Sequence, residues 1–320
     1  MKKIIIGILT VLAIMGIFFF TQKNSVQKQP TYTIGIIQTA SHPALDASRD
    51  GFIEELNHLL NGDVSFVVKN AQGSVAQAHA LAQQMRSNKT YNGFFAIATP
   101  AAQALHAAEK ERPVFIAAVT DPQALGFVYK DTNICGTKDM IDVPGQINLI
   151  TQLVPQAKTI GLLYTSGEAN SIVLVESMRK EITNRGLIAL DFAVSNESDI
   201  PVMVQTACRK VDLLLAPTDN TIASAIGLIS TIARKNKKSL IVSDNMLVQY
   251  GPLASRGVDY KANGAQTARI AHAVLVDHKK PADLPIEQAS SNQIYINTAT
   301  AAELDILIPD SIKNNVVFVD

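Results

Sequence analysis

The chain has 320 residues, of which 28 are basic and 28 acidic, so its net charge is zero, and 47% of its residues are hydrophobic. This composition is typical of a globular protein, and the length suits one large or two medium domains. Because neither an excess of positive charge nor a basic stripe with interleaved aromatic residues is present, nucleic-acid binding is not expected.

The first residues have the pattern of an export signal. Lys2 and Lys3 precede an uninterrupted uncharged run over residues 4–20, and polar residues follow. Lysines before an apolar run favour a cytoplasmic start with the body across the membrane. No small-x-small cleavage site follows Phe20, and the run is short for a membrane span. Residues 1–30 are therefore predicted to be a signal peptide or an N-terminal membrane anchor, with a periplasmic or otherwise extracytoplasmic body.

From residue 32 onward, short apolar runs alternate with segments of helical periodicity. Eight runs are predicted to be strands: residues 33–37, 64–69, 93–98, 114–119, 159–164, 188–193, 212–217 and 240–244. The helical segments between them carry an apolar face, such as Leu45, Phe52 and Leu56 in the first. Strands that are apolar on both faces and separated by helices indicate a parallel sheet covered on both sides.

An internal repeat divides the body into two halves. "TIGIIQTASHPALDASRDGFIEEL" from Thr33 and "TIGLLYTSGEANSIVLVESMRKEI" from Thr159 share an Ile-Gly pair, a polar loop and a helix, and the second pair follows the first by 126 positions (160 − 34). The pattern predicts an α/β fold of two doubly wound parallel-sheet lobes with a ligand cleft between them. We expect residues 31–155 to form lobe 1, residues 156–258 to form lobe 2, and residues 259–320 to cross back and complete lobe 1.

The polar loops after the predicted strands form the candidate binding site. In doubly wound sheets, ligands bind beyond the carboxyl ends of the strands, where helix N-termini present free N–H groups. Two facing lobes would place the loops of both halves around one cleft. The candidate ligand-binding residues in these loops are Gln38, Ser41, His42, Thr99, Ala101, Thr120, Asp121, Tyr164, Glu168, Asn170, Ser171, Asp219, Asn220 and Asp244.

The loops carry no enzyme signature. No GxGxxG fingerprint follows the first strand, and no Walker-type loop, G-x-S-x-G elbow or metal-spaced pair of histidines is present. Ser, Thr and Asn side chains with a few acids suit a small polar ligand instead. No catalytic residue, metal site or cofactor is therefore predicted, and the ligand is expected to be a small zwitterion.

Each end of such a zwitterion has candidate partners. Amides after Thr99 and around Ser41 could hold a carboxylate at a helix N-terminus. The acids that could hold an ammonium group are Asp121, Glu168, Asp219 and Asp244. Each acid could instead cap a helix. Adjacent residues cannot both be the cap of one helix, so the pair Asp219 and Asn220 favours ligand contact for Asp219. We therefore expect Asp219→Ala to abolish ligand-induced stabilisation while the melting temperature of the ligand-free protein stays nearly unchanged.

The two cysteines, Cys135 and Cys208, are far apart in the sequence and form no metal-binding or redox motif. One disulfide is permitted in an exported protein of this size but is not needed. We interpret them as two separate buried thiols.

The combination of "HPALDA", "SGEANS", "PTDN" and "GVDY", in this order, resembles the substrate-binding proteins of ABC transporters in the family that includes tryptophan and tyrosine binders. The resemblance spans residue 32 to about residue 309. It implies a type I periplasmic-binding-protein fold whose lobes close on a ligand and present it to an ABC permease. It also implies cleft roles for the loop of His42 and for Thr99, Asp121, Glu168, Asn170, Ser171, Asp219 and Asn220.

The ligand that the resemblance favours is an aromatic amino acid, for which Tyr164, Phe127 and Tyr250 are the predicted ring partners. The lipobox cysteine of Gram-positive members is absent, which favours a periplasmic protein, and a monomer is expected. Two alternatives stay open at this point. One is an exported ligand-sensing domain of the same fold that signals to a membrane receptor, and the other is a two-lobed enzyme such as a glycosyltransferase.

Overall fold

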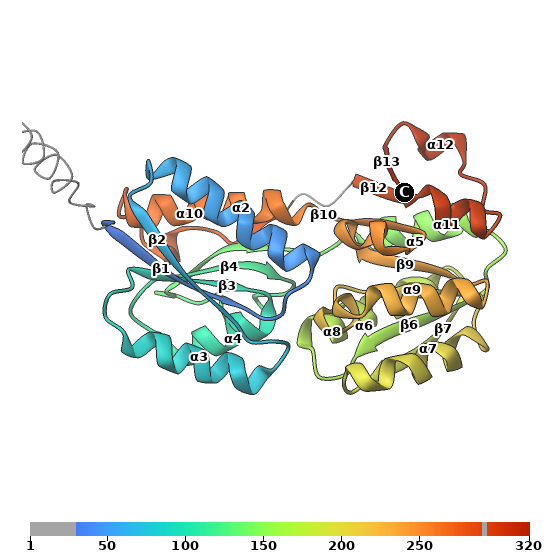
Figure 1. The fold of residues 1–320 in the computed structure, drawn as a ribbon, viewed down its shortest axis with the longest axis horizontal. Coiled ribbons are helices and arrows are strands. Elements are labelled where there is room, and N and C mark those ends of the chain that lie inside the picture. The colour runs from blue at the N-terminus through green and yellow to red at the C-terminus, as the bar shows by residue number, and fades with distance from the viewer. Residues whose placement is uncertain (1–29, 290–292) are drawn as a thin grey trace, which may run out of the picture. The chain divides into compact units, whose positions relative to one another are not determined.

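The computed structural model describes residues 30–289 and 293–320. The predicted signal or anchor segment, residues 4–20, lies outside this part of the chain. Within residues 30–289 and 293–320, no helix combines the length and the hydrophobicity needed to cross a membrane. The body consists of two α/β lobes (Figure 1).

Lobe 1 is built on a parallel sheet with the strand order β11-β5-β4-β3-β1-β2. Its strands are β1 (Tyr32–Gln38), β2 (Val64–Asn70), β3 (Gly93–Ile97), β4 (Val114–Val119), β5 (Ile134–Lys138) and β11 (Glu287–Gln288). Both faces are covered, because Phe95 and Ile97 of β3 join one apolar cluster while Phe94 and Ala96 join another. Alternation along the strand sends successive side chains to opposite faces, so a strand buried on both sides reads as a continuous apolar run.

Helices α2 (Pro43–Leu59) and α10 (Tyr260–Leu275) lie on one side of this sheet, and α3 (Val75–Ser87) and α4 (Thr99–Ala108) on the other (Figure 1). A short turn, η3 (Pro281–Asp283), precedes β11. The helices α2 and α10 approach each other closely through glycine. A Cβ on Gly264 would lie 1.9 Å from the Ser48 carbonyl oxygen, and one on Gly51 would lie 2.1 Å from the Lys261 carbonyl oxygen. This contact fixes the middle of α2 against the N-terminal part of α10.

Lobe 2 has a seven-stranded sheet with the order β13-β12-β10-β9-β8-β6-β7. Its strands are β6 (Thr159–Thr165), β7 (Ile188–Val194), β8 (Leu213–Ala216), β9 (Ser239–Asp244), β10 (Ala254–Val258), β12 (Gln293–Asn297) and β13 (Val316–Val319). Its helices are α5 (Val143–Leu153), α6 (Ala169–Asn184), α7 (Ile200–Cys208), α8 (Asn220–Ser224), α9 (Ile226–Lys235), α11 (Thr298–Glu303) and α12 (Asp310–Lys313), with the turns η1 (Glu197–Asp199) and η2 (Asn245–Tyr250).

The repeat seen in the sequence is present in the topology. The order β2-β1-β3-β4-β5 in lobe 1 corresponds to β7-β6-β8-β9-β10 in lobe 2. All eight predicted strands exist, and the predicted two-lobed α/β fold is confirmed. The sequence did not predict every strand. Among those it missed, β5 is short and partly polar, and β11 and β13 lie at the edges of their sheets.

The C-terminal segment corrects one expectation. Of residues 259–320, only α10, η3 and β11 join lobe 1, whereas β12 and β13 extend the sheet of lobe 2. β12 pairs with β10 in antiparallel fashion, and β13 pairs with β12 in parallel. A chain that arrives from lobe 1 enters lobe 2 at the carboxyl edge of its strands. It can then run only in the opposite direction to β10.

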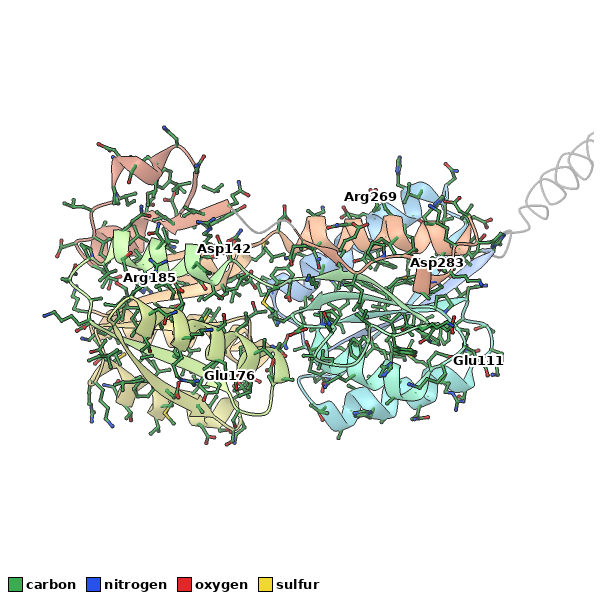
Figure 2. All side chains as sticks on the ribbon, turned by 180° about the vertical axis from the view of Figure 1, so that it is seen from behind. Glu111, Asp142, Glu176, Arg185, Arg269 and Asp283 are labelled. Carbon is green, nitrogen blue, oxygen red and sulfur yellow. The ribbon has the colours of Figure 1, made fainter. Side chains whose placement is uncertain are left out.

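The connection from β5 to α5 is tied to lobe 2 by polar contacts. The Asp142 side chain caps α5 by accepting from the Gly145 N–H, and it forms an ion pair with Arg256 at 2.9 Å. Arg185 also donates to the carbonyl oxygen of Pro144 at 3.0 Å. Figure 2 labels Asp142 and Arg185, which lie close together in lobe 2.

The predicted separate thiols are confirmed. Both cysteines are buried and unpaired, Cys135 in lobe 1 and Cys208 in lobe 2. Burial raises the pKa of Cys135 to about 12, so this thiol has no nucleophilic character near neutral pH.

Candidate ligand-binding site

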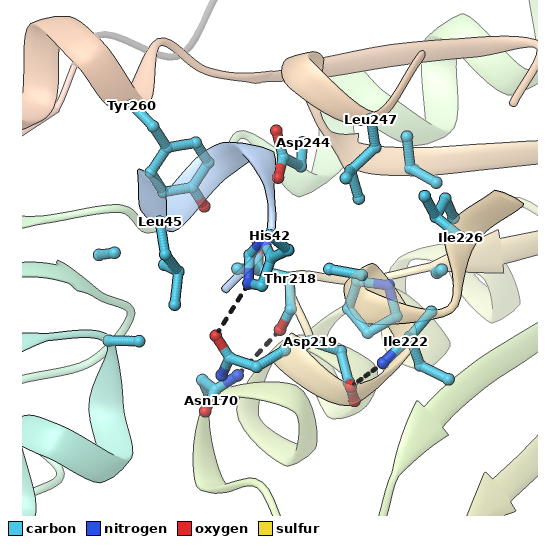
Figure 3. Close-up of a pocket in the computed structure, with 17 residues that line it drawn as sticks. His42, Leu45, Asn170, Thr218, Asp219, Ile222, Ile226, Asp244, Leu247 and Tyr260 are labelled. Carbon is cyan, nitrogen blue, oxygen red and sulfur yellow. Dashed lines mark hydrogen bonds between the residues drawn. The ribbon is translucent and has the colours of Figure 1, made fainter. Parts of the chain in front are cut away.

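The carboxyl ends of strands from both lobes meet around one pocket (Figure 3). Lobe 1 contributes His42, Leu45, Ala98, Ala118 and Tyr260 to its lining. Lobe 2 contributes Asn170, Ala216, Pro217, Thr218, Asp219, Asn220, Ile222, Ala223, Ile226, Val242, Asp244 and Leu247. The cavity measures only about 20 Å³, room for about one water molecule. We name this region the interlobe pocket.

Two wider grooves open beside the interlobe pocket. The first, of about 390 Å³, is mostly apolar and lies between the loop of Asp121 and Leu125 and the start of α6. The second, of about 550 Å³, is polar and lies between Ser41 and the loop of Asn196. Asn170 lines both the interlobe pocket and the apolar groove, so the two border the same side chain.

The carboxylate of Asp219 accepts hydrogen bonds at all of its acceptor sites from groups of lobe 2. Its Oδ1 accepts from the Ile222 N–H and the Thr165 hydroxyl, both at 2.9 Å. Its Oδ2 accepts from the Thr165 N–H at 2.6 Å and the Ser171 hydroxyl at 2.7 Å. A carboxylate has about four lone-pair sites, so these four bonds leave no acceptor for a ligand. Asp219 is the N-cap of α8, the alternative that the sequence left open.

Glu168 belongs to the same network. Its Oε1 accepts from the N–H and the hydroxyl of Thr221, and its Oε2 accepts from the N–H and the side-chain amide of Asn220 and from the Asn170 amide. Together with Asp219, it satisfies the first three N–H groups of α8. Burial and the nearby Glu168 charge raise the pKa of Asp219. The two acids therefore shape the loop that carries Asn220, and neither has an acceptor left for a ligand.

Three buried residues around the pocket and its adjoining apolar groove each carry a polar atom without a partner, and Oγ1 of the half-buried Thr218 is a fourth such atom. The atoms of the three buried residues are Nδ1 of His42, Oγ1 of Thr99 and Oδ1 of Asn170. The residues are 7%, 1% and 5% exposed. Buried polar atoms are nearly always hydrogen-bonded, and each unpaired one costs about 1–3 kcal/mol. Their grouping on both sides of one pocket indicates a site that a polar ligand completes.

The protonation state of His42 follows from its neighbours. The Asn220 amide donates to Glu168, which turns its Oδ1 toward Nε2 of His42, 3.4 Å away. Nε2 therefore carries the proton. Burial lowers the pKa of His42, so the ring is neutral and its free Nδ1 is an acceptor. This hydrogen bond also joins the two lobes.

Two helix N-termini point at the pocket region with unequal donor sets. At α4, Pro100 has no N–H and the Ala101 N–H donates to the Thr39 hydroxyl at 3.2 Å, which leaves the N–H and hydroxyl of Thr99. At α6, no described residue accepts from the N–H groups of residues 169–171. Such free N–H groups attract carboxylates.

A second group of acids lies deeper, beside the connections between the lobes. Asp139 follows β5 and accepts from the Tyr260 hydroxyl at 2.8 Å and the Thr120 hydroxyl at 3.0 Å. Asp244 ends β9 and accepts from the Met246 N–H at 2.8 Å. Burial raises the pKa of Asp139, and burial together with the Asp139 charge raises that of Asp244 to about 7.

The lobe 1 wall of the pocket contains strained backbone. Ala98 has φ 73° with ψ 163°, a conformation that essentially only glycine adopts, and Ala118 has φ 56°. Both residues end strands and both line the interlobe pocket. Strain of about 1–3 kcal/mol per residue persists where the surrounding structure fixes it, commonly at ligand sites.

Several predicted site residues lie elsewhere. The Gln38 side chain is used by Ala40, Asp46 and Arg49. Ser41 also bonds to Asp46, at the edge of the polar groove. Both therefore organise the start of α2, because an acid in its first turn recruits these donors.

The other candidates that do not line the pocket lie within strands or turns. Tyr164 packs into a buried apolar cluster, because a side chain within a strand points to one face of the sheet and not beyond the carboxyl end of the strand. Thr120 supports Asp139, and Asp121 accepts from the Ala124 N–H at the apolar groove. Two other predicted ring partners also lie away from the pocket: Phe127 is buried in lobe 1 and Tyr250 is exposed at the end of η2.

The pocket also contains residues that sequence reasoning missed. Tyr260 contributes a phenol ring to its lining and is 1% exposed, and Asp139, which accepts from its hydroxyl, is 0% exposed. Tyr260 belongs to the "GVDY" segment, but nothing local in that segment indicates which strand ends it contacts. Asp139 could have been suspected as an acid that directly follows a short strand at the end of lobe 1. Among the residues that the structure describes, no three acids, histidines or cysteines are placed to hold a metal ion.

Comparison with known proteins gives consistent results over the whole body. A family model described as "ABC transporter substrate binding protein" matches residues 33–317. A curated protein of Clostridioides difficile, named "Tyrosine-binding protein", is 33% identical over 301 residues, which cover 91% of this chain and 86% of that protein.

Two solved structures of similar sequence differ in how well they superpose. One, from Streptococcus pneumonia, is described as an ABC domain in complex with L-Trp; it has 34% identity and a TM-score of 0.86, and the match covers 90% of this chain and 99% of that one. The other is the ligand-free, open structure of a substrate binding protein with adhesive properties from Clostridium difficile. It has 31% identity and a TM-score of 0.68, with 91% and 99% covered.

Proposed function

The chain belongs to the ABC transporter substrate-binding protein family, and we propose that its interlobe pocket binds a free amino acid, preferably an aromatic one, for import. Proteins of this family are extracytoplasmic, bind small solutes and work with ABC permeases; the family is one of binding proteins, not of enzymes. Relatives that share about a third of their residues with this chain are described as binding tyrosine or tryptophan. Retention of residues 4–20 as an anchor remains a proposal.

The observation that carries this proposal is the set of unpaired buried polar atoms from both lobes. Thr99 and His42 belong to lobe 1, and Asn170 belongs to lobe 2. A ligand that pairs with all three would touch both lobes at once. Its differential affinity for the closed arrangement would then shift the equilibrium between open and closed forms.

The ligand carboxylate has a natural place between α4 and α6. The free N–H and hydroxyl of Thr99 and the free N–H groups at the start of α6 are donors of the kind that a carboxylate needs. The apolar side chain would lie against Leu45 of lobe 1 and against Ile222 and Leu247 of lobe 2, or extend into the apolar groove beside Asn170.

Entry of an amino acid requires the walls of the pocket to separate. A cavity of about 20 Å³ is far smaller than any amino acid. At similar identity, the better superposition on the tryptophan complex than on the open, ligand-free structure supports hinge opening as the route of entry. Motion of this kind is common in two-lobed binding proteins.

Thermal-shift screening of the purified protein against the twenty amino acids tests the proposal. At a hundredfold excess over Kd, a ligand that binds only the folded state stabilises it by about 2.7 kcal/mol. Tryptophan, tyrosine and phenylalanine should raise Tm, whereas glycine should not. If no amino acid raises Tm while sugars or other solutes do, the proposed ligand class is wrong.

A further inference from the structure

The ammonium group of an amino acid needs a negative or acceptor partner, and four acids were candidates from the sequence. Two of them, Glu168 and Asp219, already accept hydrogen bonds from N–H and hydroxyl groups of lobe 2 at all of their acceptor sites. A cation could bind there only by displacing bonds that hold α8. Neither acid is therefore a suitable counter-ion.

Two further acids are poorly placed. Asp121 is partly exposed in a turn and lines the apolar groove, not the interlobe pocket. Asp139 is completely buried behind Tyr260 and Thr120, accepts from both hydroxyls and does not line the pocket.

Asp244 has the opposite properties. It lines the interlobe pocket and is 4% exposed, yet one N–H, that of Met246, is its sole hydrogen-bond donor among the described residues. Among residues 30–289 and 293–320, none donates a hydrogen bond to its Oδ2, and no lysine or arginine forms an ion pair with it. A buried carboxylate without a cation is costly unless something neutralises it. Figure 3 shows Asp244 above His42 and beside Tyr260 at the same pocket.

We propose that Asp244 is the counter-ion for the ammonium group of the bound ligand, and that it restricts the pocket to solutes that carry a primary amine. This inference rests on the proposed function. The free Nδ1 of His42 is a second acceptor for the same group, since the tautomer set by Asn220 leaves it unprotonated. An ammonium group has three N–H donors, so a charged and a neutral acceptor can both be used.

The first test compares analogues on wild-type protein and on Asp244→Asn. Calorimetry with L-tryptophan, indole-3-propionate and tryptamine separates the amine from the carboxylate. Wild type should bind tryptophan at least about a hundredfold more tightly than indole-3-propionate, the loss expected when a buried charge is left unpaired. Asp244→Asn should lose a similar factor for tryptophan and should no longer discriminate against indole-3-propionate.

The variant is designed to keep the fold. Asparagine has nearly the same volume and can still accept from the Met246 N–H, so the cap of η2 is retained. Asp191→Asn is the matched control, because it removes a carboxylate from an exposed ion pair of lobe 2 outside the pocket. Its tryptophan affinity should equal that of wild type, and Tm of both variants shows that they are folded.

The pH dependence of binding gives a second readout. The titratable groups around Asp244 are Asp139 and Tyr260, which interact with it electrostatically, and His42 and Asp219, which line the same pocket. Because the folded-state pKa of Asp244 is about 7, a proton competes with the ligand cation below that pH. Tryptophan affinity of wild type should therefore fall up to about tenfold per pH unit below pH 7. In Asp244→Asn this slope should be lost, even though Asp139 and Asp219 remain.

The outcomes distinguish the two proposals. If wild type binds no amino acid, the proposed function fails. If wild type binds tryptophan but Asp244→Asn binds it within about threefold and still rejects indole-3-propionate, the counter-ion assignment is overturned. Loss of binding in Asp121→Asn with retention in Asp244→Asn would assign the role to Asp121 instead.

Discussion

The helices that follow β3 and β8 occupy equivalent places in the repeat, yet only one of the two N-termini is capped by side chains. In lobe 2, Asp219 caps α8 and Glu168 covers two further N–H groups. In lobe 1, the N-cap of α4 is Ala98, which has no side chain that can cap the helix, and the Thr99 hydroxyl is buried and unpaired. Both ends lie at the interlobe pocket.

The difference indicates a division of roles between two copies of one plan. Polar groups that are saturated within their own lobe hold the loop in shape, and those left unsaturated are available to a ligand. Residue type alone would suggest the reverse, because the acidic end of lobe 2 looks more like a binding site than the neutral end of lobe 1. Substitutions at the N-terminus of α8 should therefore change the stability of the ligand-free protein, and substitutions at the N-terminus of α4 should change the affinity for the ligand.

The largest effect is expected at the saturated end. Asp219→Ala removes the acceptor of four hydrogen bonds and should lower the free energy of unfolding by about 3 kcal/mol, since buried donors are left unpaired. This reverses the expectation from sequence alone. Urea denaturation of the ligand-free protein measures it, with Asp219→Asn as a milder control that keeps one acceptor oxygen. An unchanged unfolding midpoint, together with lost ligand binding, would contradict the division of roles.

A smaller effect, on affinity and not on stability, is expected at the unsaturated end. Thr99→Val keeps the shape but removes the unpaired hydroxyl, and it should weaken tryptophan binding about tenfold, the value of one hydrogen bond to a charged group. Stability of the ligand-free protein should not fall, because no hydrogen bond within the protein is lost. Thr99→Ser retains the hydroxyl and should bind nearly as wild type does. Equal affinities for all three proteins would mean that the hydroxyl does not contact the ligand.

The smallest effect concerns the backbone of lobe 1. Ala98→Gly should stabilise the ligand-free protein by about 1 kcal/mol, because glycine tolerates the positive φ that strains alanine. Ala101→Gly, three residues along in α4, should destabilise by up to about 1 kcal/mol, since a helical glycine costs backbone entropy. Thermal unfolding of both variants measures these effects: relative to wild type, Tm should rise for Ala98→Gly and fall for Ala101→Gly. A destabilised Ala98→Gly would show that this backbone is not strained.

Much of the fold could be read from the sequence because its signals are local or periodic. Apolar runs on both faces of β3 and β8 predict buried parallel strands, and the repeated Ile-Gly pairs at Ile34 and Ile160 predict two similar lobes. The destination of β12 and β13 was not accessible in this way. Whether a late strand joins one sheet or the other depends on which edge it reaches, and that edge is made by distant segments.

The candidate site was predicted only in outline. Strand-end loops of both lobes do meet at one pocket, and His42, Asn170, Asn220 and Asp244 line it as expected. Gln38, Ser41 and Tyr164 do not line it, and loop membership could not show this, because it does not reveal which partner a side chain already has. Tyr260 was missed because it does not belong to a strand-end loop. It enters the pocket from α10, the helix that follows the return of the chain to lobe 1.

By itself, the sequence determined the family, the two-lobed plan and the strand ends at which a ligand would bind, since these follow from short patterns of apolar and polar residues. Only the tertiary structure decided which polar groups are free. Asp219 and Asp244 are both buried acids at the ends of strands in lobe 2, but one accepts four hydrogen bonds and the other one. The number of donors around a carboxylate depends on segments remote in the chain, and that number shows which of the two capping acids has acceptor capacity left for a ligand.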